Sequence, residues 1–538
     1  MKRSSLFVLL CAAALASNPL AAATPCGGLT ALRLPNNTTV DTATVVPAGP
    51  FVRPGATTPA NVPAFCRVAG TSRPTSDSEI HYEVWMPASG WNGKFDHGGN
   101  GGYGGSLGTP AGYMLNGLLR GYATAGTDMG HDARVTPGAS FALGHPEKLV
   151  DWASRANHVT AVAAKLIIRA YYGMPAYLSY FTGCSDGGHE ALMEAQRFPD
   201  DFDGIVAGAP ANYWTHQSAA WVWEALAGLN VLPVSKLPMI NAAAVAACPG
   251  IVPTVIDDPT RCGFDPASLR CAGADGPNCL TEAQVDAVRK IYAGPRNPRT
   301  GEQIYPGLER GSEAAGGLLG GSGSWSTLIS SAQTFLGGDT WKYMVFKDPR
   351  WDFHTLDFDR DVALADEVAG PITDSTDPDL SDFRALGGKM IIWHGWADPL
   401  VNPRNSIDYL RSVAAAGRGK QETAQDDDEA ARRTQGFLRL FMAAGLTHCS
   451  GGPGLTTFDT LTALERWVEQ GQAPKKLIAS HTDLAFPDNV MRNEPPAGTF
   501  SRPLCPWPEV ARYLGKGSKT DARSFVCARE TGDQDDDD

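Results

Sequence analysis

The sequence predicts an α/β fold with a mostly parallel sheet that is interrupted by one large insertion. Short apolar runs of strand length alternate with amphipathic helical patterns in two parts of the chain. These runs cover residues 177–181, 204–208, 389–395 and 437–441. Between residues 213 and 380 the alternation disappears, and Trp-rich helical pieces with Cys- and Pro-rich loops replace it. A chain of 538 residues that is 43% hydrophobic can bury a core large enough for both parts.

The N-terminus has the features of a signal peptide. Lys2 and Arg3 precede an apolar run over residues 6–16, and the Ala-rich residues 20–23 offer a cleavage site. We therefore expect residues 1–23 to be removed and the mature protein to be secreted or periplasmic. No later stretch is long and apolar enough for a transmembrane helix, so we expect no membrane partner.

The charge balance excludes one class of partner. The formal net charge is −13, and no basic tract offsets it. Nucleic-acid binding depends on basic surfaces that neutralise phosphates, so we expect no nucleic-acid partner. The acidic residues 531–538 at the end of the chain predict a disordered tail.

The cysteines indicate disulfides. Of 11 cysteines, Cys11 leaves with the signal peptide, and the ten that remain form an even set in an oxidising compartment. Five disulfides are expected, although the spacing alone does not give their connectivity. A zinc site is the alternative, but the sequence has no paired CxxC motif and no Cys/His cluster at ligand spacing.

A glycine run follows an early strand pattern. Residues 81–86 alternate as a strand, and His97 to Gly105 contain six glycines around Asn100 and Tyr103. A Gly-rich loop in this place can supply a backbone N–H to a developing oxyanion. A phosphate-binding loop is disfavoured because no Lys-Ser/Thr pair follows. The other alternative is a flexible loop without function.

The strongest motif is G-x-S-x-G at residues 183–187. It lies after the strand pattern at 177–181 and before a helical pattern that ends near Pro199. A nucleophilic serine at a sharp strand-to-helix turn needs small residues two positions before and after it, and Gly183 and Gly187 satisfy this. The N–H of Asp186 would then face an oxyanion from the helix N-terminus. An inert serine in a Gly-rich turn is the alternative to Ser185 as nucleophile.

Two further residues complete a candidate catalytic triad. Asp398 follows the apolar run at 389–395, and His448 follows the run at 437–441. The order Ser, Asp, His is the one that α/β-hydrolases use. His448 would accept the Ser185 proton, and Asp398 would orient the imidazole. Cys184 precedes Ser185 and Cys449 follows His448, so a formed triad would bring these cysteines within bridging distance.

Three motifs resemble the tannase/feruloyl esterase family, which includes the mono(hydroxyethyl) terephthalate hydrolases. They are Gly183-Cys184-Ser185-Asp186-Gly187-Gly188, His394-Gly395-Trp396-Ala397-Asp398 and His448-Cys449-Ser450-Gly451-Gly452-Pro453-Gly454. The resemblance extends from about Cys26 to Cys527. It implies an α/β-hydrolase core over residues 24–212 and 381–530, with residues 213–380 as a lid domain. It also favours the N–H of Gly102 as the second oxyanion donor, with Gly101 as the neighbouring candidate.

The same resemblance implies a disulfide pattern and raises the question of calcium. The implied pairs are Cys26–Cys66, Cys184–Cys449, Cys248–Cys262, Cys271–Cys279 and Cys505–Cys527. Family members usually carry a calcium loop of spaced aspartates shortly after the first lid cysteine. Calcium needs six to eight oxygen ligands, and Asp257 and Asp258 are only weak candidates, so we doubt a structural calcium here. No cofactor is needed for the chemistry.

The resemblance implies a serine carboxylic-ester hydrolase that acts on phenolic or aromatic acid esters, of the feruloyl esterase or tannase type. The substrate would be a small aromatic ester, free or attached to plant polysaccharide or tannin. A terephthalate half-ester or another aryl ester is the main alternative. The half-ester enzymes use a lid arginine, whereas residues 338–343 here contain Lys342 and no arginine. A peptidase and a non-catalytic binding protein are the remaining alternatives.

Overall fold

The computed structural model describes residues 23–248, 250, 252–314, 324–330, 337–417, 433–482, 489 and 498–529. Residues 1–22 of the expected signal peptide and the expected tail at 531–538 lie outside this range. In the described residues no helix is long and apolar enough to cross a bilayer.

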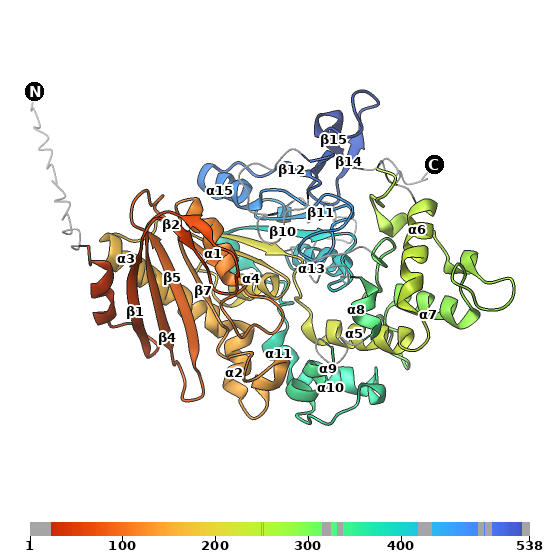
Figure 1. Ribbon diagram of the computed structural model, residues 1–538, viewed down its shortest axis with the longest axis horizontal. Helices are drawn as coiled ribbons and strands as arrows, with labels where there is room; N and C mark the ends of the chain where they lie inside the picture. The colour runs from red at the N-terminus through yellow and green to blue at the C-terminus, as the bar shows by residue number, and fades with distance from the viewer. Residues whose placement is uncertain are drawn as a thin grey trace, which may run out of the picture.

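A nine-stranded sheet forms the centre of the molecule (Figure 1). Its spatial order is β1 (Thr38–Val46), β4 (Phe65–Ser72), β5 (Ile80–Pro87), β7 (Ala123–Thr127), β6 (Lys94–Gly98), β8 (Leu178–Cys184), β9 (Gly204–Gly208), β10 (Lys389–Gly395) and β11 (Leu438–Ala443). The six strands from β7 to β11 in this order are parallel, and β1, β4 and β5 pair antiparallel at one edge. The predicted α/β class with a mostly parallel sheet is confirmed.

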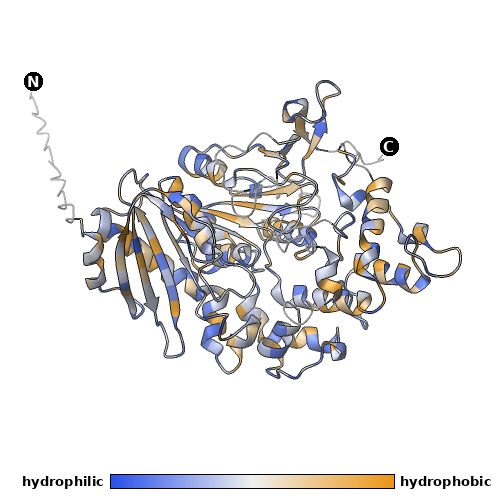
Figure 2. Ribbon diagram, viewed as in Figure 1, coloured by the Kyte–Doolittle hydropathy of each residue, from blue (hydrophilic) through white to orange (hydrophobic). Residues whose placement is uncertain are grey.

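Helices cover both faces of the sheet, which explains why its central strands are apolar throughout. Every residue of β7 and β9 is buried, and Figure 2 shows hydrophobic residues in the central strands. Helices α3 (Ala156–Tyr172), α4 (Asp186–Arg197) and α13 (Pro403–Ala416) contribute to one hydrophobic cluster. Helices α1 (Pro110–Leu119) and α15 (Thr460–Gln470) contribute to another. Strands buried on both faces are typical of parallel sheets.

The segment between β9 and β10 is helical. Its described residues add no strand to the nine-stranded sheet. Its longer helices are α5 (Trp214–Gly228), α6 (Leu237–Ala247), α7 (Glu282–Ala293), α8 (Trp325–Ser330) and α10 (Arg360–Val368). Helices α6, α7 and α8 lie at the opposite end of the molecule from β1 and β4 (Figure 1). We call residues 213–380 the inserted segment.

Smaller elements and disulfides complete the fold. Two antiparallel two-stranded sheets follow α15. One pairs β12 (Leu477–Ser480) with β13 (Ser501–Leu504), and the other pairs β14 (Val510–Tyr513) with β15 (Phe525–Ala528). The structure contains the disulfides Cys26–Cys66, Cys184–Cys449, Cys248–Cys262, Cys271–Cys279 and Cys505–Cys527. These are the five pairs that the family resemblance implies.

Candidate active site

Ser185 lies in a strained turn between β8 and α4. Its φ of 68° and ψ of −122° are values that a residue with a side chain rarely adopts. The turn is tight because a Cβ on Gly183 would lie 2.2 Å from the carbonyl oxygen of Gly187. A Cβ on Gly187 would lie 2.9 Å from the carbonyl oxygen of Asn100. The two glycines are therefore required by close backbone contacts, as the motif predicts.

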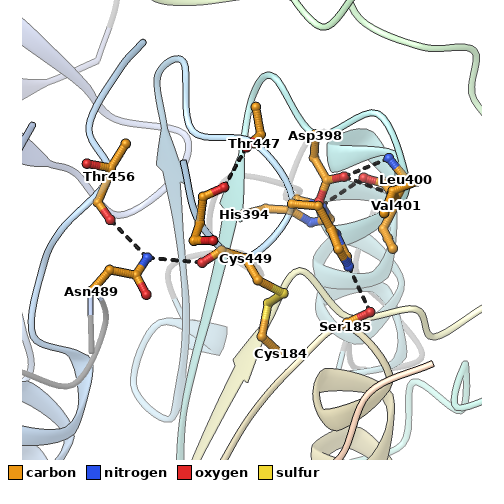
Figure 3. Close-up of a disulfide and its surroundings, with 12 residues drawn as sticks. Cys184, Ser185, His394, Asp398, Leu400, Val401, Thr447, Cys449, Thr456 and Asn489 are labelled. Atoms are coloured by element: carbon orange, nitrogen blue, oxygen red, sulfur yellow. Dashed lines mark hydrogen bonds and ion pairs between the residues drawn. A yellow bond between two sulfur atoms is a disulfide. The ribbon is translucent and has the colours of Figure 1, made fainter. Parts of the chain in front are cut away.

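Ser185, His448 and Asp398 form a continuous hydrogen-bonded chain. His448 Nε2 is 2.8 Å from Ser185 Oγ, and His448 Nδ1 is 2.7 Å from Asp398 Oδ2. Asp398 follows β10 and His448 follows β11, so the carboxyl ends of neighbouring parallel strands bring the three groups together. Figure 3 shows Ser185 and Asp398 at the two ends of this chain.

Asp398 is buried and held as an anion. Its Oδ1 accepts hydrogen bonds from the N–H groups of Leu400 at 2.8 Å and Val401 at 3.0 Å. His394 Nε2 donates to the Val401 carbonyl at 3.0 Å and lies 3.3 Å from Asp398 Oδ2. Burial alone would raise the pKa of Asp398, but the charge and hydrogen bonds of His448 and His394 hold that pKa well below its usual range.

A disulfide and an asparagine fix the histidine loop. Cys184 and Cys449 are bonded, so the neighbours of Ser185 and His448 are covalently joined. Asn489 Nδ2 donates to the carbonyl oxygens of Cys449 and Thr456, both at 3.0 Å (Figure 3). Asn489 is fully buried, and sequence reasoning did not identify it.

Two backbone N–H groups are available for an oxyanion. Within the described part of the chain, neither Asp186 N nor Gly102 N has a hydrogen-bond acceptor. Asp186 is the first residue of α4, and Gly102 has a φ of 60° in the glycine loop. The N–H of Gly101, in contrast, donates to Asn100 Oδ1 at 3.0 Å. This geometry favours Gly102 over Gly101 as the second donor.

The inserted segment contacts the loop that carries Asp398. Trp221 Nε1 donates to the Leu400 carbonyl at 2.8 Å, and Arg404 forms an ion pair with Glu309. Trp214, Trp325 and Trp341 are at most 1% exposed, so they pack inside the molecule. The inserted segment therefore holds the loop that carries Asp398.

The weak calcium candidates have other contacts. Asp258 accepts hydrogen bonds from the backbone N–H and hydroxyl of Thr260, and Asp257 lies 3.8 Å from the Arg502 guanidinium. Among the described residues, one group of three side chains has metal-ligand spacing, and it contains Cys271 and Cys279. Their sulfurs are bonded to one another, so neither is a thiolate ligand. That Asp257 and Asp258 hold no structural calcium stays a prediction.

The family assignment follows from the comparison with known proteins. Residues 66–528 match the family model described as tannase and feruloyl esterase. The chain belongs to this family. This tannase and feruloyl esterase family member has the α/β-hydrolase fold and is a carboxylic ester hydrolase.

Individual relatives agree with the assignment. An uncharacterized esterase of Xanthomonas campestris is 41% identical, with 94% of this chain and 91% of the relative covered. A mono(2-hydroxyethyl) terephthalate hydrolase of Piscinibacter sakaiensis is 32% identical over 88% of this chain and 86% of its own. The crystal structure of feruloyl esterase B from Aspergillus oryzae superposes with a TM-score of 0.80 at 26% identity, covering 94% of this chain and 99% of that one.

Proposed function

We propose that this family member hydrolyses esters of phenolic aromatic acids, of the ferulate or gallate type, with Ser185 as nucleophile. The observation that carries the proposal is the hydrogen bond of 2.8 Å between Ser185 Oγ and His448 Nε2. A neutral imidazole at this distance can accept the hydroxyl proton as the oxygen attacks the ester carbonyl.

The reaction has two steps. Ser185 Oγ attacks the carbonyl carbon while its proton moves to His448 Nε2, and Asp398 stabilises the imidazolium through Nδ1. His448 then gives the proton to the leaving alcohol, which leaves an acyl-enzyme. In the second step His448 removes a proton from water, the hydroxide attacks the acyl group, and Ser185 recovers its proton as the acid leaves.

The oxyanion of each tetrahedral intermediate would lie between two N–H groups. Asp186 N–H lies at the start of α4, where the helix dipole also favours negative charge. Gly102 N–H comes from the glycine loop after β6. Donors that are fixed before the reaction stabilise the transition state without reorganisation, which is the largest contribution in many hydrolases.

The proposed substrate class rests on family membership and on the lack of an arginine in residues 338–343. Feruloyl esterase B from Aspergillus oryzae has the same fold, and residues 338–343 contain Lys342 but no arginine for a second carboxylate. The relative from Piscinibacter sakaiensis makes a terephthalate half-ester the second candidate. Export to the periplasm or the medium agrees with five disulfides, which persist in oxidising compartments.

A substrate panel tests this function. Methyl ferulate, methyl gallate and mono(2-hydroxyethyl) terephthalate are supplied separately to the wild type and to Ser185→Ala. We expect turnover of a phenolic ester by the wild type, and a loss of several orders of magnitude in kcat in the variant. Preference for the half-ester would replace the substrate assignment. Equal ester turnover in both proteins would reject Ser185 as nucleophile.

A further inference from the structure

A chain of buried polar groups connects the glycine loop with α4, next to the two proposed oxyanion donors. Asn100 N–H donates to Glu190 Oε2 at 2.9 Å, and the carboxyls of Glu190 and Asp186, four residues apart on α4, interact electrostatically. Asp186 Oδ1 lies 3.2 Å from His189 Nδ1, and His189 Nε2 lies 2.8 Å from the carbonyl oxygen of Thr373. Asp186, His189 and Glu190 have no exposed surface.

The partners at the two ends fix the direction of every hydrogen bond. A carbonyl oxygen only accepts, so His189 Nε2 carries a hydrogen and donates to Thr373. Burial lowers the pKa of His189 to about 4, so the ring is neutral and Nδ1 is an acceptor. Asp186 Oδ1 must then donate a proton to His189 Nδ1.

The same reasoning applies to the two carboxyls. Glu190 Oε2 accepts from Asn100, whereas Glu190 Oε1 and Asp186 Oδ2 are buried and meet no hydrogen-bond donor among the described residues. Two ionised carboxylates would each offer only acceptors to the other. A proton on Glu190 would let it donate to Asp186 and so satisfy both buried oxygens. Burial raises the pKa of both carboxyls well above their usual range, which agrees with two neutral acids.

We propose that Glu190 is a positioning residue for the oxyanion hole, and that Glu190 and Asp186 act as neutral acids in a chain from Asn100 to Thr373. This inference rests on the proposed function, because it assigns a role to the support of Gly102 and Asp186 N–H. Asn100 connects this chain of buried groups to the glycine loop that carries Gly102. Its side chain donates to Ser106 and Thr127 carbonyls at 3.0 Å, accepts from Gly101, and its carbonyl accepts from Gly187.

The chain has an electrostatic consequence as well as a geometric one. The backbone N–H of Asp186 is one of the two proposed oxyanion donors. An ionised carboxylate on the same residue would oppose the negative charge of the transition state. The titratable groups that interact with Glu190 are Asp186 and Glu194 on α4 and Tyr113 on α1; the uncharged Asn157 faces it from α3. Neutral acids at these positions leave the oxyanion site without a competing charge.

Glu190→Gln preserves the pattern and Glu190→Ala breaks it. A glutamine amide accepts from Asn100 with its oxygen and donates to Asp186 with its nitrogen, so activity at neutral pH should stay within a few-fold of the wild type. Alanine leaves Asn100 N–H and Asp186 Oδ2 without partners, and kcat should fall on the order of 10²-fold with little change in KM, as when one oxyanion donor is lost.

Glu194→Ala is the matched control. Glu194 is also a buried carboxyl on α4, one turn further along, and no hydrogen bond joins it to residues 99–102 in the described structure. It should keep wild-type kcat even if its melting temperature changes. Equal losses of kcat in Glu190→Ala and Glu194→Ala would overturn the positioning role, as would a folded Glu190→Ala with unchanged kcat.

A pH profile keeps the proposal testable if Glu190→Ala does not fold. The wild type should lose kcat on the alkaline side as the buried acids ionise, and Glu190→Gln should move this loss to higher pH. Superimposable profiles would overturn the neutral-acid chain. Wild-type ester turnover that Ser185→Ala abolishes is measured in parallel, so a failure of the proposed function is seen separately.

Discussion

The disulfide between Cys184 and Cys449 joins residues 265 positions apart, and each cysteine is the chain neighbour of one partner in the Ser185–His448 hydrogen bond. The link therefore fixes the proposed nucleophile and base relative to one another. Ser185 has a left-handed backbone, and Cys449 has a φ of 60°, so both sides of the link are conformationally constrained. A constraint of this kind acts on the geometry of the site as well as on stability.

Removing this disulfide should impair catalysis more than removing another one. In Cys184→Ala/Cys449→Ala we expect a loss of about 2–5 kcal/mol in the free energy of unfolding, with a fall in kcat measured on the folded protein. The control is Cys505→Ala/Cys527→Ala, which removes the link between the residue after β13 and strand β15. It should lose stability and keep kcat; equal kcat losses in the two variants would contradict a role for the first disulfide in alignment.

The orienting carboxylate is tested by Asp398→Asn. An amide can present an N–H to His448 Nδ1, which favours the wrong tautomer of the ring, so kcat should fall on the order of 10⁴-fold. Substrate affinity should change little, because Asp398 is fully buried behind the imidazole. Steady-state kinetics with a phenolic ester measure both, and a loss below tenfold would contradict the assignment of Asp398.

Asn489 offers a prediction that sequence reasoning did not reach. In Asn489→Asp the two N–H donors to Cys449 and Thr456 become acceptors, and a buried charge faces two carbonyl oxygens. We expect a loss of about 1–3 kcal/mol in stability or more, together with a lower kcat. Asn489→Ala removes the donors without adding charge and should be milder. A variant series in the reverse order would contradict this reading of the contacts.

The buried carboxyl of Glu224 in α5 should make the stability of the folded protein depend on pH. It is buried, its Oε2 has no partner within the described residues, and burial raises its pKa well above the usual range. In the unfolded chain Glu224 loses its proton above a pKa of about 4.3, whereas the folded protein keeps it to higher pH. The stability of the wild type therefore falls as pH rises from the unfolded pKa towards the raised folded pKa. Glu224→Gln should gain melting temperature over the wild type as pH increases from about 4.

The control for this prediction is Glu302→Gln, which changes an exposed carboxyl of the inserted segment. Its difference in melting temperature from the wild type should stay flat with pH. A flat difference for Glu224→Gln as well would contradict the role of the buried acid.

Hydrophobic patterns located the sheet well because strands buried on both faces are continuous apolar runs. The predicted strands at 204–208 and 389–395 coincide with β9 and β10. The strand predicted at 177–181 is β8, which continues to Cys184. The prediction ended too early because Gly183 and Cys184 belong to a turn motif and do not show a strand pattern. Helix α3 begins at Ala156 after a wider helical turn over Asp151–Arg155, and hydrophobic periodicity does not distinguish the two.

The proposed catalytic triad could be selected from sequence because its members follow strand ends in a known order. Asn100, Glu190 and Asn489 could not, since their roles depend on contacts between distant segments. Asn100 meets Glu190 across 90 positions, and Asn489 meets Cys449 across 40. No spacing rule links such pairs, and a buried glutamate on a helix has no pattern that separates it from an exposed one.

The hydrogen bond from Trp221 to the Leu400 carbonyl, with the ion pair between Glu309 and Arg404, makes residues 213–380 a structural partner of the aspartate loop. Engineers who transplant this segment from a relative to alter substrate choice would therefore also exchange the scaffold beneath the triad. Chimaeras should carry matching residues at 400–404, or retain Trp221 and Glu309 from the recipient.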